Sequence, residues 1–211
     1  MKTILMQGDS ITDAGRNRTM EATPSNNHAL GNGYANLTAA ALLEKYPEKD
    51  LQIYNRGISG HRVVDLYARW KVDTLNLQPD ILSILIGVND VWHERSYANG
   101  VEADRFEQIY DLLLDWTFKA LPQVKVVLLE PFTMLCGEVD EAFAADTAVR
   151  AAITRKLAAK YNTEFLPTQQ ILDEACKRAE PAYWAKDGVH PTPAGHALIT
   201  EALVKKFELF L

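Results

Sequence analysis

Short apolar runs alternate with longer amphipathic stretches along this chain. The runs in 80–87 and 125–130 are almost continuously apolar, as expected of strands that are buried on both faces of a parallel sheet. We therefore predict five strands, at residues 3–7, 51–55, 80–87, 125–130 and 163–166.

The stretches between these runs show the spacing of helices. One is rich in Ala and Leu over 33–46 and ends before Pro47, and another covers 142–161. Within 102–121, apolar residues recur at helical spacing at Phe106, Ile109, Leu113 and Leu114. The last predicted helix has Thr192 as its N-cap and Pro193 at its first position, and it extends to about residue 207. Strands that alternate with helices predict an α/β fold with a parallel sheet.

Composition narrows the class of protein. The 211 residues contain no repeat or linker, so we predict a single domain over 1–211, and 47% hydrophobic with 24% charged residues is typical of a soluble globular protein. The net charge of −6 without a Lys/Arg run argues against a nucleic-acid partner. No apolar run is long enough for a membrane span or a signal peptide, so we expect a cytoplasmic protein without membrane association. Cys136 and Cys176 are expected to be free thiols, with a single disulfide as the alternative.

Candidate chemistry gathers at one edge of the predicted sheet. Ser10, Gly57, Asn89 and Glu130 each follow a strand, and ligands of open α/β sheets bind beyond the carboxyl ends of the strands. Taken alone, Ser10 could be a helix cap, a phosphate-loop hydroxyl or a nucleophile. A serine nucleophile needs a base that takes its proton and a third group that orients the base.

Asp187 and His190 could supply both partners. A carboxylate three residues before an imidazole, in a loop bounded by Gly188 and Pro191, can turn back onto the Nδ1–H of the ring and leave Nε2 for Ser10. This favours the nucleophile interpretation of Ser10.

Acyl transfer also needs hydrogen-bond donors for the developing oxyanion. The backbone N–H of Gly57 after the second strand, the side-chain amide of Asn89 after the third, and the N–H of Ser10 are the predicted donors.

Other types of site fit less well. A phosphate-binding loop leaves Asp187 and His190 without a role, and no Lys stands in the loop. The nucleophile elbow of α/β-hydrolases has the pattern G-x-S-x-G, whereas Thr12 stands at its last position. A metal site with Asp187, His190 and His196 is not expected, because His196 lies inside the last helix as a packing residue. We predict no metal and no cofactor. The remaining histidines, His28, His61 and His93, are interpreted as solvated loop residues.

Aspartates and tryptophans close to these loops are candidates for substrate binding. Asp9 and Asp13 flank Ser10, and we assign Asp9 a supporting, substrate-binding role. Trp92 and Trp184 adjoin two of the loops and are predicted to contact substrate, with packing as the alternative. Trp70 and Trp116 lie in helical patterns and are predicted to pack.

Together these motifs resemble the four sequence blocks of the SGNH (GDSL-type) serine hydrolases. The blocks are GDSIT around Ser10, NRGISG around Gly57, IGVND around Asn89 and DGVHP around His190, in the family's order. The resemblance implies a flavodoxin-like three-layer sandwich with strand order 2-1-3-4-5. It also implies Ser10 as nucleophile, His190 as base, Asp187 as its orienting group, and Ser10, Gly57 and Asn89 as the oxyanion hole.

Longer motifs are similar to one branch, the intracellular acetylxylan esterases of xylan-using bacteria. They are GDSITDAGR, GNGYANL, LYARW, GVNDVW and AYWAKDGVHPTPAGH. The resemblance implies a small acetylated carbohydrate as substrate and a homo-oligomer. The acidic segment 136–146 matches none of these motifs and leaves the substrate rim and subunit contacts undefined. An aryl- or lysophospholipid-type esterase and a non-catalytic flavodoxin-like ligand-binding module remain as alternatives.

Overall fold

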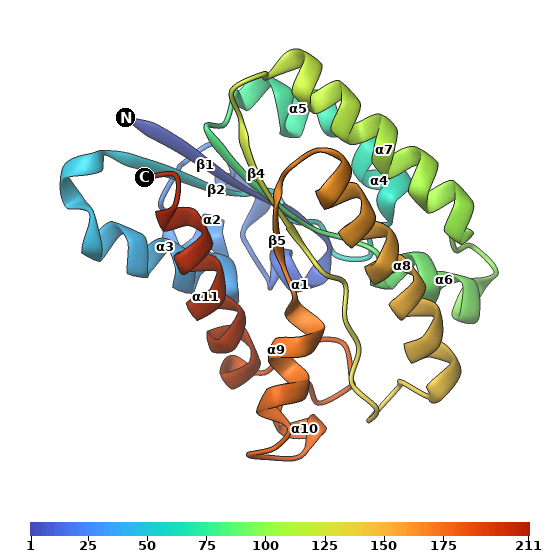
Figure 1. Cartoon of the computed structure of the whole chain (residues 1–211). Coiled ribbons are helices and arrows are strands. Elements are labelled where there is room, and N and C mark those ends of the chain that lie inside the picture. The colour runs from blue at the N-terminus through green and yellow to red at the C-terminus, as the bar shows by residue number, and fades with distance from the viewer.

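A single parallel sheet forms the centre of the molecule in the computed structural model, which describes all residues 1–211 (Figure 1). Its strands are β1 (Lys2–Gly8), β2 (Leu51–Asn55), β3 (Ile81–Leu85), β4 (Lys125–Leu129) and β5 (Glu164–Leu166). The spatial order is β2-β1-β3-β4-β5, and every neighbouring pair is parallel. The predicted three-layer α/β fold with a five-stranded parallel sheet is confirmed.

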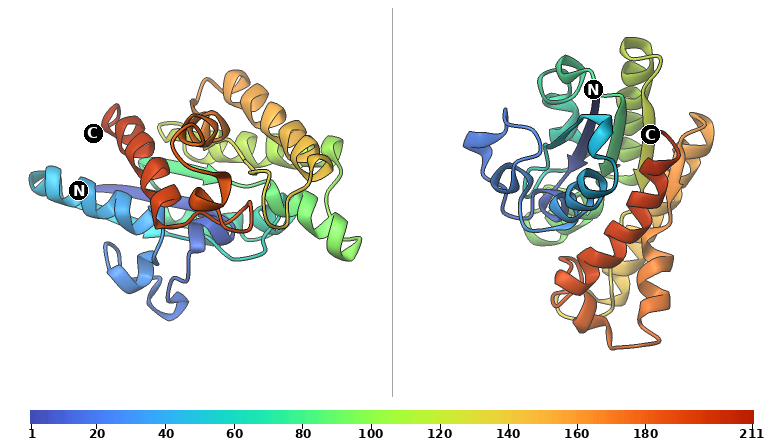
Figure 2. Two further views of the ribbon diagram at one scale, coloured as in Figure 1. Left: turned by 90° about the horizontal axis from the view of Figure 1, so that it is seen from below. Right: turned by 90° about the vertical axis from the view of Figure 1, so that its left-hand side faces the viewer.

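Helices cover both faces of this sheet (Figure 2). One layer is formed by α3 (Tyr34–Lys45), α9 (Thr168–Ala175) and α11 (Pro193–Glu208), the other by α4 (Val63–Ala68), α5 (Trp70–Asp73), α7 (Ala103–Ala120) and α8 (Glu141–Lys160). Alternate strand residues point to opposite faces. Accordingly, Ile4 and Met6 belong to the apolar cluster under α3 and α11, whereas Leu5 belongs to the cluster under α7. Both faces of β1 are therefore buried, which explains its continuous apolar run.

The long helices begin and end within a residue or two of the predicted positions. The structure adds shorter helices that were not predicted. They are α4, α5 and α9, together with α1 (Ser10–Asp13), α2 (Asn27–Leu30), α6 (Val88–Tyr97), α10 (Pro181–Trp184) and three 3₁₀ turns at Arg18–Met20, Pro47–Lys49 and Leu75–Leu77. Most of them are too short for a helical period to appear in the sequence. β3 ends at Leu85, two residues earlier than predicted, because Gly87 has a φ of 134° and starts the turn into α6.

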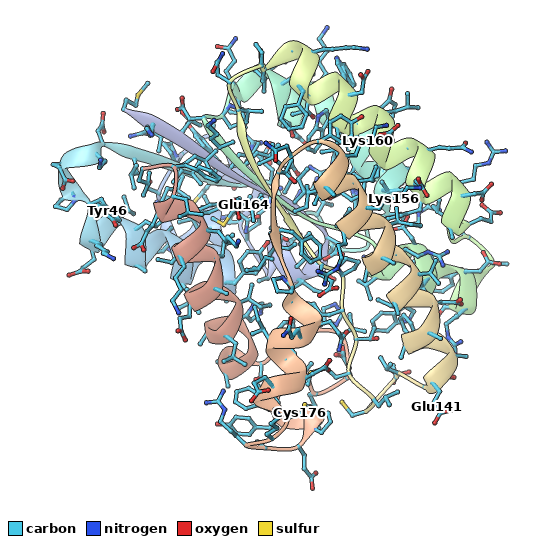
Figure 3. All side chains as sticks on the ribbon, viewed as in Figure 1. Tyr46, Glu141, Lys156, Lys160, Glu164 and Cys176 are labelled. Carbon is cyan, nitrogen blue, oxygen red and sulfur yellow. The ribbon has the colours of Figure 1, made fainter.

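Charged side chains join the two long helices on the outside of the second layer. Figure 3 labels Lys156 and Lys160 on α8; they form ion pairs with Glu107 and Asp111 of α7, both at 2.6 Å. Exposed pairs of this kind contribute about 0–1 kcal/mol each. The helix layers are therefore held mainly by their apolar faces.

None of the helices combines the length and the apolar character that crossing a lipid bilayer requires. Cys136 and Cys176 are half-buried free thiols.

Candidate active site

Ser10 lies at the carboxyl end of the central strand β1, where the chain turns into the short helix α1. Asp9 caps this helix, with its Oδ1 accepting a hydrogen bond from the N–H of Ile11 at 3.0 Å. Gly8 is needed at the end of the strand because a Cβ there would lie 2.3 Å from Thr12 Oγ1 and 2.4 Å from the Leu85 carbonyl oxygen. The turn thus places the half-buried Ser10 side chain at the surface edge of the sheet.

Ser10, His190 and Asp187 come together in one hydrogen-bonded row. Ser10 Oγ lies 2.7 Å from His190 Nε2, and His190 Nδ1 lies 2.6 Å from Asp187 Oδ2. The other carboxylate oxygen, Oδ1, accepts the backbone N–H groups of Val189 at 3.0 Å and His190 at 2.7 Å. A carboxylate that holds Nδ1–H leaves Nε2 free to accept the hydroxyl proton of Ser10. The arrangement has the geometry needed to activate a serine.

Burial alone would raise the pKa of Asp187. The hydrogen bonds from the His190 side chain and from the His190 and Val189 backbone outweigh it and lower the pKa below its usual value. Asp187 is therefore ionised when it faces the imidazole.

Residues 134–138, which include the start of the segment 136–146 that matched no motif, form hydrogen bonds with the Asp187 loop. Glu138 N–H donates to the Asp187 carbonyl at 2.9 Å, and Met134 N–H donates to the Gly188 carbonyl at 2.8 Å. Gly188 has a φ of 84°, and a Cβ there would lie 2.4 Å from the Cys136 carbonyl. The remainder of the segment starts α8. Sequence reasoning missed this support because nothing in residues 131–139 indicates which loop they contact.

Gly57 does not occupy the predicted oxyanion position. Its N–H donates to Asn55 Oδ1 at 2.8 Å, and a Cβ on Gly57 would lie 2.4 Å from the backbone nitrogen of Asp13. The residue is buried against the backbone of α1, and its N–H is directed to Asn55. Gly57 is required for close packing rather than for donating a hydrogen bond to a ligand, which corrects the prediction.

Gly60, three residues later, has the features that Gly57 lacks. Its φ is 80°, it is half-buried, and its N–H has no acceptor within the chain. The next residue accepts a hydrogen bond from Asn89, whose Nδ2 lies 3.1 Å from the His61 carbonyl oxygen. This contact orients the Asn89 amide beside Gly60. The N–H of Ser10 likewise has no acceptor within the chain. Sequence alone could not choose between the two glycines of NRGISG.

Asp9 is 1% exposed and therefore does not reach a substrate, contrary to the prediction. Its Oδ1 caps α1, and its Oδ2 is buried without a hydrogen-bond partner. Burial raises the pKa of Asp9 to about 7, against smaller opposing contributions from the Ile11 N–H and the charge of His190. Asp13 connects α1 to the loop that contains Gly57 and Gly60 (the glycine loop), because its Oδ2 accepts a hydrogen bond from Ser59 N–H at 3.0 Å.

The two tryptophans predicted to bind substrate differ. Trp92 on α6 is half-buried, with its ring centroid 5.7 Å from that of His190 and 5.7 Å from that of Phe143. Trp184 is 6% exposed, and its Nε1 donates to the Ala179 carbonyl at 3.2 Å, so it is a packing residue, contrary to the prediction. Trp92 alone stands beside the histidine. As predicted, Trp70 is a core residue: it is fully buried.

Histidine environments correct part of the sequence interpretation. His61 is half-buried, with Nδ1 accepting from Arg69 Nε at 3.1 Å, and His93 is half-buried on α6 rather than in a loop. His196 packs inside α11, as predicted, and its Nδ1 accepts from Tyr34 N–H at 3.1 Å. Burial lowers the pKa of His196 to about 4, so it accepts as a neutral imidazole. No group of three His, Cys, Asp or Glu side chains converges in the way a metal ion requires.

Comparisons with known proteins agree with this geometry. Residues 7–198 match the GDSL-like lipase/acylhydrolase family. The chain is 35% identical over 205 residues to an acetylxylan esterase of Geobacillus stearothermophilus, covering 96% of this chain and 92% of that one.

Solved structures show the same fold. A crystal structure described as a GDSL-like lipase from Parabacteroides merdae superposes with a TM-score of 0.95 at 39% identity, covering 99% of this chain and 96% of that one. The Geobacillus acetylxylan esterase superposes with a TM-score of 0.87 at 34% identity, covering 97% and 93%. The predicted resemblance is thereby confirmed, and the alternative of a non-catalytic ligand-binding module is not supported. The chain belongs to the GDSL-like lipase/acylhydrolase family and is a carboxylic ester hydrolase.

Proposed function

We propose that this protein is a serine esterase that removes acetyl groups from acetylated xylo-oligosaccharides or related small carbohydrate esters. The observation that carries the chemistry is the row from Ser10 Oγ through His190 to Asp187, at 2.7 and 2.6 Å. The Geobacillus relative, described as an acetyl-xylooligosaccharide esterase, supports the substrate class.

Variants of that relative also support the assignment of the three residues. Alanine replacements of a serine, an aspartate and a histidine are described there as catalytic mutants, and its aspartate precedes its histidine by three positions. Asp187 and His190 have the same spacing.

In the proposed reaction, Ser10 Oγ attacks the acetyl carbonyl carbon and gives its proton to His190 Nε2. The negative oxygen that develops accepts hydrogen bonds from the N–H of Ser10, the N–H of Gly60 and Nδ2 of Asn89. We assign Gly60 in place of Gly57 because its N–H is unpaired and lies next to the anchored Asn89 amide.

Collapse of this intermediate breaks the ester bond. His190 returns the proton to the sugar oxygen, which leaves as a hydroxyl, and Ser10 keeps the acetyl group as an acyl-enzyme. A water molecule, deprotonated by His190, then attacks the acyl-enzyme and releases acetate and free Ser10.

The surroundings of Ser10 favour a small acyl group. A cavity of about 900 Å³ lies between α8, α9 and the loop after β4, with Glu130, Met134 and Arg155 among its lining residues, and it does not include Ser10, Asn89 or His190. A long-chain acyl ester needs an extended apolar pocket beside the nucleophile, whereas an acetyl group does not. We therefore place an aryl- or lysophospholipid-type substrate second. Trp92, beside His190, is the proposed contact for a sugar ring.

Acetate release from acetylated xylobiose tests the proposal. Wild type should release acetate, and Ser10→Ala should abolish release while leaving the fold intact. Ser96→Ala, which alters an exposed serine on α6, is the matched control and should retain full activity. Hydrolysis of aryl acetates without release from acetylated xylobiose would keep the nucleophile but reject the carbohydrate substrate. Activity that persists in Ser10→Ala would reject the mechanism.

Homo-oligomeric assembly and a cytoplasmic location stay predictions that derive from the sequence resemblance and composition. Light scattering of the purified protein tests the first, and fractionation of the source cells tests the second.

A further inference from the structure

Two consecutive residues at the start of α6 hold the loop that carries Gly60. Asn89 Nδ2 donates to the carbonyl of His61 at 3.1 Å. The carboxylate of Asp90 accepts the backbone N–H of Val63, at 3.0 Å from Oδ1 and 3.3 Å from Oδ2. These contacts lie one and three residues after Gly60. Asn89 and Asp90 thus fix the position of Gly60 relative to β3, the strand that precedes α6 and pairs with β1.

Asp90 is an unusual residue for this task because it is 0% exposed. Val63 N–H is the one hydrogen-bond donor to its side chain. Burial raises the pKa of Asp90 to about 7, with Val63 N–H and the charge of Arg150 lowering it and the charge of Asp9 raising it. Burying a carboxylate with so few partners costs free energy of folding. Its contribution to stability is therefore a poor explanation for its presence.

Further hydrogen bonds connect the backbone of Asp90 to Val101 and, through Val101, to α8. The Asp90 carbonyl accepts from Val101 N–H at 2.9 Å, and the Val101 carbonyl accepts from Arg150 Nη2 of α8 at 2.6 Å. Asp90 is therefore anchored on its backbone side to rigid elements, while its side chain reaches the glycine loop.

We propose that Asp90 is a positioning residue that keeps the Gly60 N–H in the oxyanion site by holding the backbone N–H of Val63. This inference rests on the proposed function. Without the carboxylate, the contact from Asn89 to His61 is the one hydrogen bond that still joins α6 to this loop, and Gly60 is free to shift relative to Asn89. Misplacing a catalytic group by about 1 Å lowers rates by about a hundredfold in well-oriented sites. Because the oxyanion develops only in the transition state, the loss should affect kcat rather than KM.

The first test is Asp90→Ala, measured with an aryl acetate so that the result does not depend on the carbohydrate. We expect kcat to fall by roughly 10- to 100-fold with KM changed by less than about threefold. Asp90→Asn keeps an oxygen that accepts from Val63 N–H and should restore kcat to within about threefold of wild type.

Asp65→Ala is the matched control. Asp65 accepts the N–H of Arg62, the residue before Val63, at 3.0 Å and caps the same helix α4, but its side chain is 31% exposed. It should lower thermal stability while changing kcat by less than about threefold, as expected for a helix cap.

Val63→Pro removes the same hydrogen bond by removing its donor, the N–H of Val63. If Asp90→Ala does not fold, the kcat of Val63→Pro tests the proposal instead. Val63 is the first residue of α4, a position where proline is tolerated. The proposal is overturned if a folded Val63→Pro or Asp90→Ala variant keeps wild-type kcat, or if Asp65→Ala lowers kcat as much as Asp90→Ala does. Absence of aryl acetate hydrolysis in wild type would instead contradict the proposed function.

Discussion

The N–H of Gly57 is bound by the side chain of Asn55, two residues earlier, at 2.8 Å. The same Asn55 uses Nδ2 to hold the carbonyls of Thr12 at 2.7 Å and Leu30 at 2.8 Å. Asn55 therefore joins the glycine loop to the nucleophile turn and to α2. This leaves Gly57 as a structural glycine and Gly60 as the proposed donor to the oxyanion.

Alanine replacements should separate these two glycines. Gly57→Ala places a Cβ 2.4 Å from Asp13 N and should lower the free energy of unfolding by about 3 kcal/mol. Gly60→Ala has space for its Cβ but requires a φ of 80°, so its stability cost should be only about 1 kcal/mol. Its kcat should nevertheless fall by about tenfold or more, because the N–H moves. Chemical denaturation and steady-state kinetics measure both effects. A Gly60→Ala enzyme with normal kcat would contradict the expected displacement of this N–H.

Asn89→Ala should lower kcat by about a hundredfold or more, because it removes a proposed oxyanion donor together with the contact to the His61 carbonyl. KM should change little. Steady-state kinetics with an aryl acetate measure the effect, and Asn76→Ala, which alters an exposed residue of the 3₁₀ turn Leu75–Leu77, serves as control. Near-normal turnover in Asn89→Ala would remove this residue from the mechanism.

Asp9 gives the stability of the protein a defined dependence on pH. Its pKa is raised from 3.8 to about 7 by burial, so the folded state binds the proton more tightly than the unfolded state. The stabilisation is complete below about pH 4 and is lost as the pH rises through about 7. Asp9→Asn lacks this titration, so its melting temperature should rise relative to that of wild type as the pH rises from 5 to 8. A difference between the two melting temperatures that stays constant over this range would show that Asp9 does not titrate as described.

Two tryptophan variants should differ in the property that they change: Trp184→Ala in stability and Trp92→Ala in substrate binding. Trp184→Ala removes a side chain that is 6% exposed and should cost about 3–5 kcal/mol of unfolding free energy. Trp92→Ala should raise KM for acetylated xylo-oligosaccharides by about fivefold, the loss of roughly 1 kcal/mol of aromatic contact. Thermal melts and kinetics on xylo-oligosaccharide and aryl acetates distinguish them. An equal KM for the oligosaccharide in Trp92→Ala and wild type would place the sugar elsewhere.

Much of the fold follows from the sequence because its strands are buried on both faces. The runs that form β3 and β4 are short and almost continuously apolar, as buried parallel strands are, and the long helix α7 between them shows its helical period. The motifs containing Ser10 and Asn89 also follow strand ends, and the structure brings His190, from the loop after α10, to Ser10 at the same edge of the sheet.

What sequence could not supply is the direction of individual groups. Gly57 and Gly60 look alike in NRGISG, and only backbone geometry shows which N–H is free. Trp92 and Trp184 both adjoin a motif, yet Trp92 lies beside His190, whereas Trp184 is buried in the core. The roles of Asp90 and of residues 131–139 depend on contacts between distant segments, for which a single sequence carries no local signal.

Ser10 and His190 are 180 positions apart, and β1, which delivers Ser10, pairs with strands on both of its sides. No local segment can assemble the reacting groups. Proteins dominated by such long-range pairings fold slowly. In a refolding experiment, ester hydrolysis should accordingly be one of the last signals to return, after helical circular dichroism has recovered. The recovery of ester hydrolysis then reports that Ser10, near the start of the chain, and His190, near its end, have come into contact.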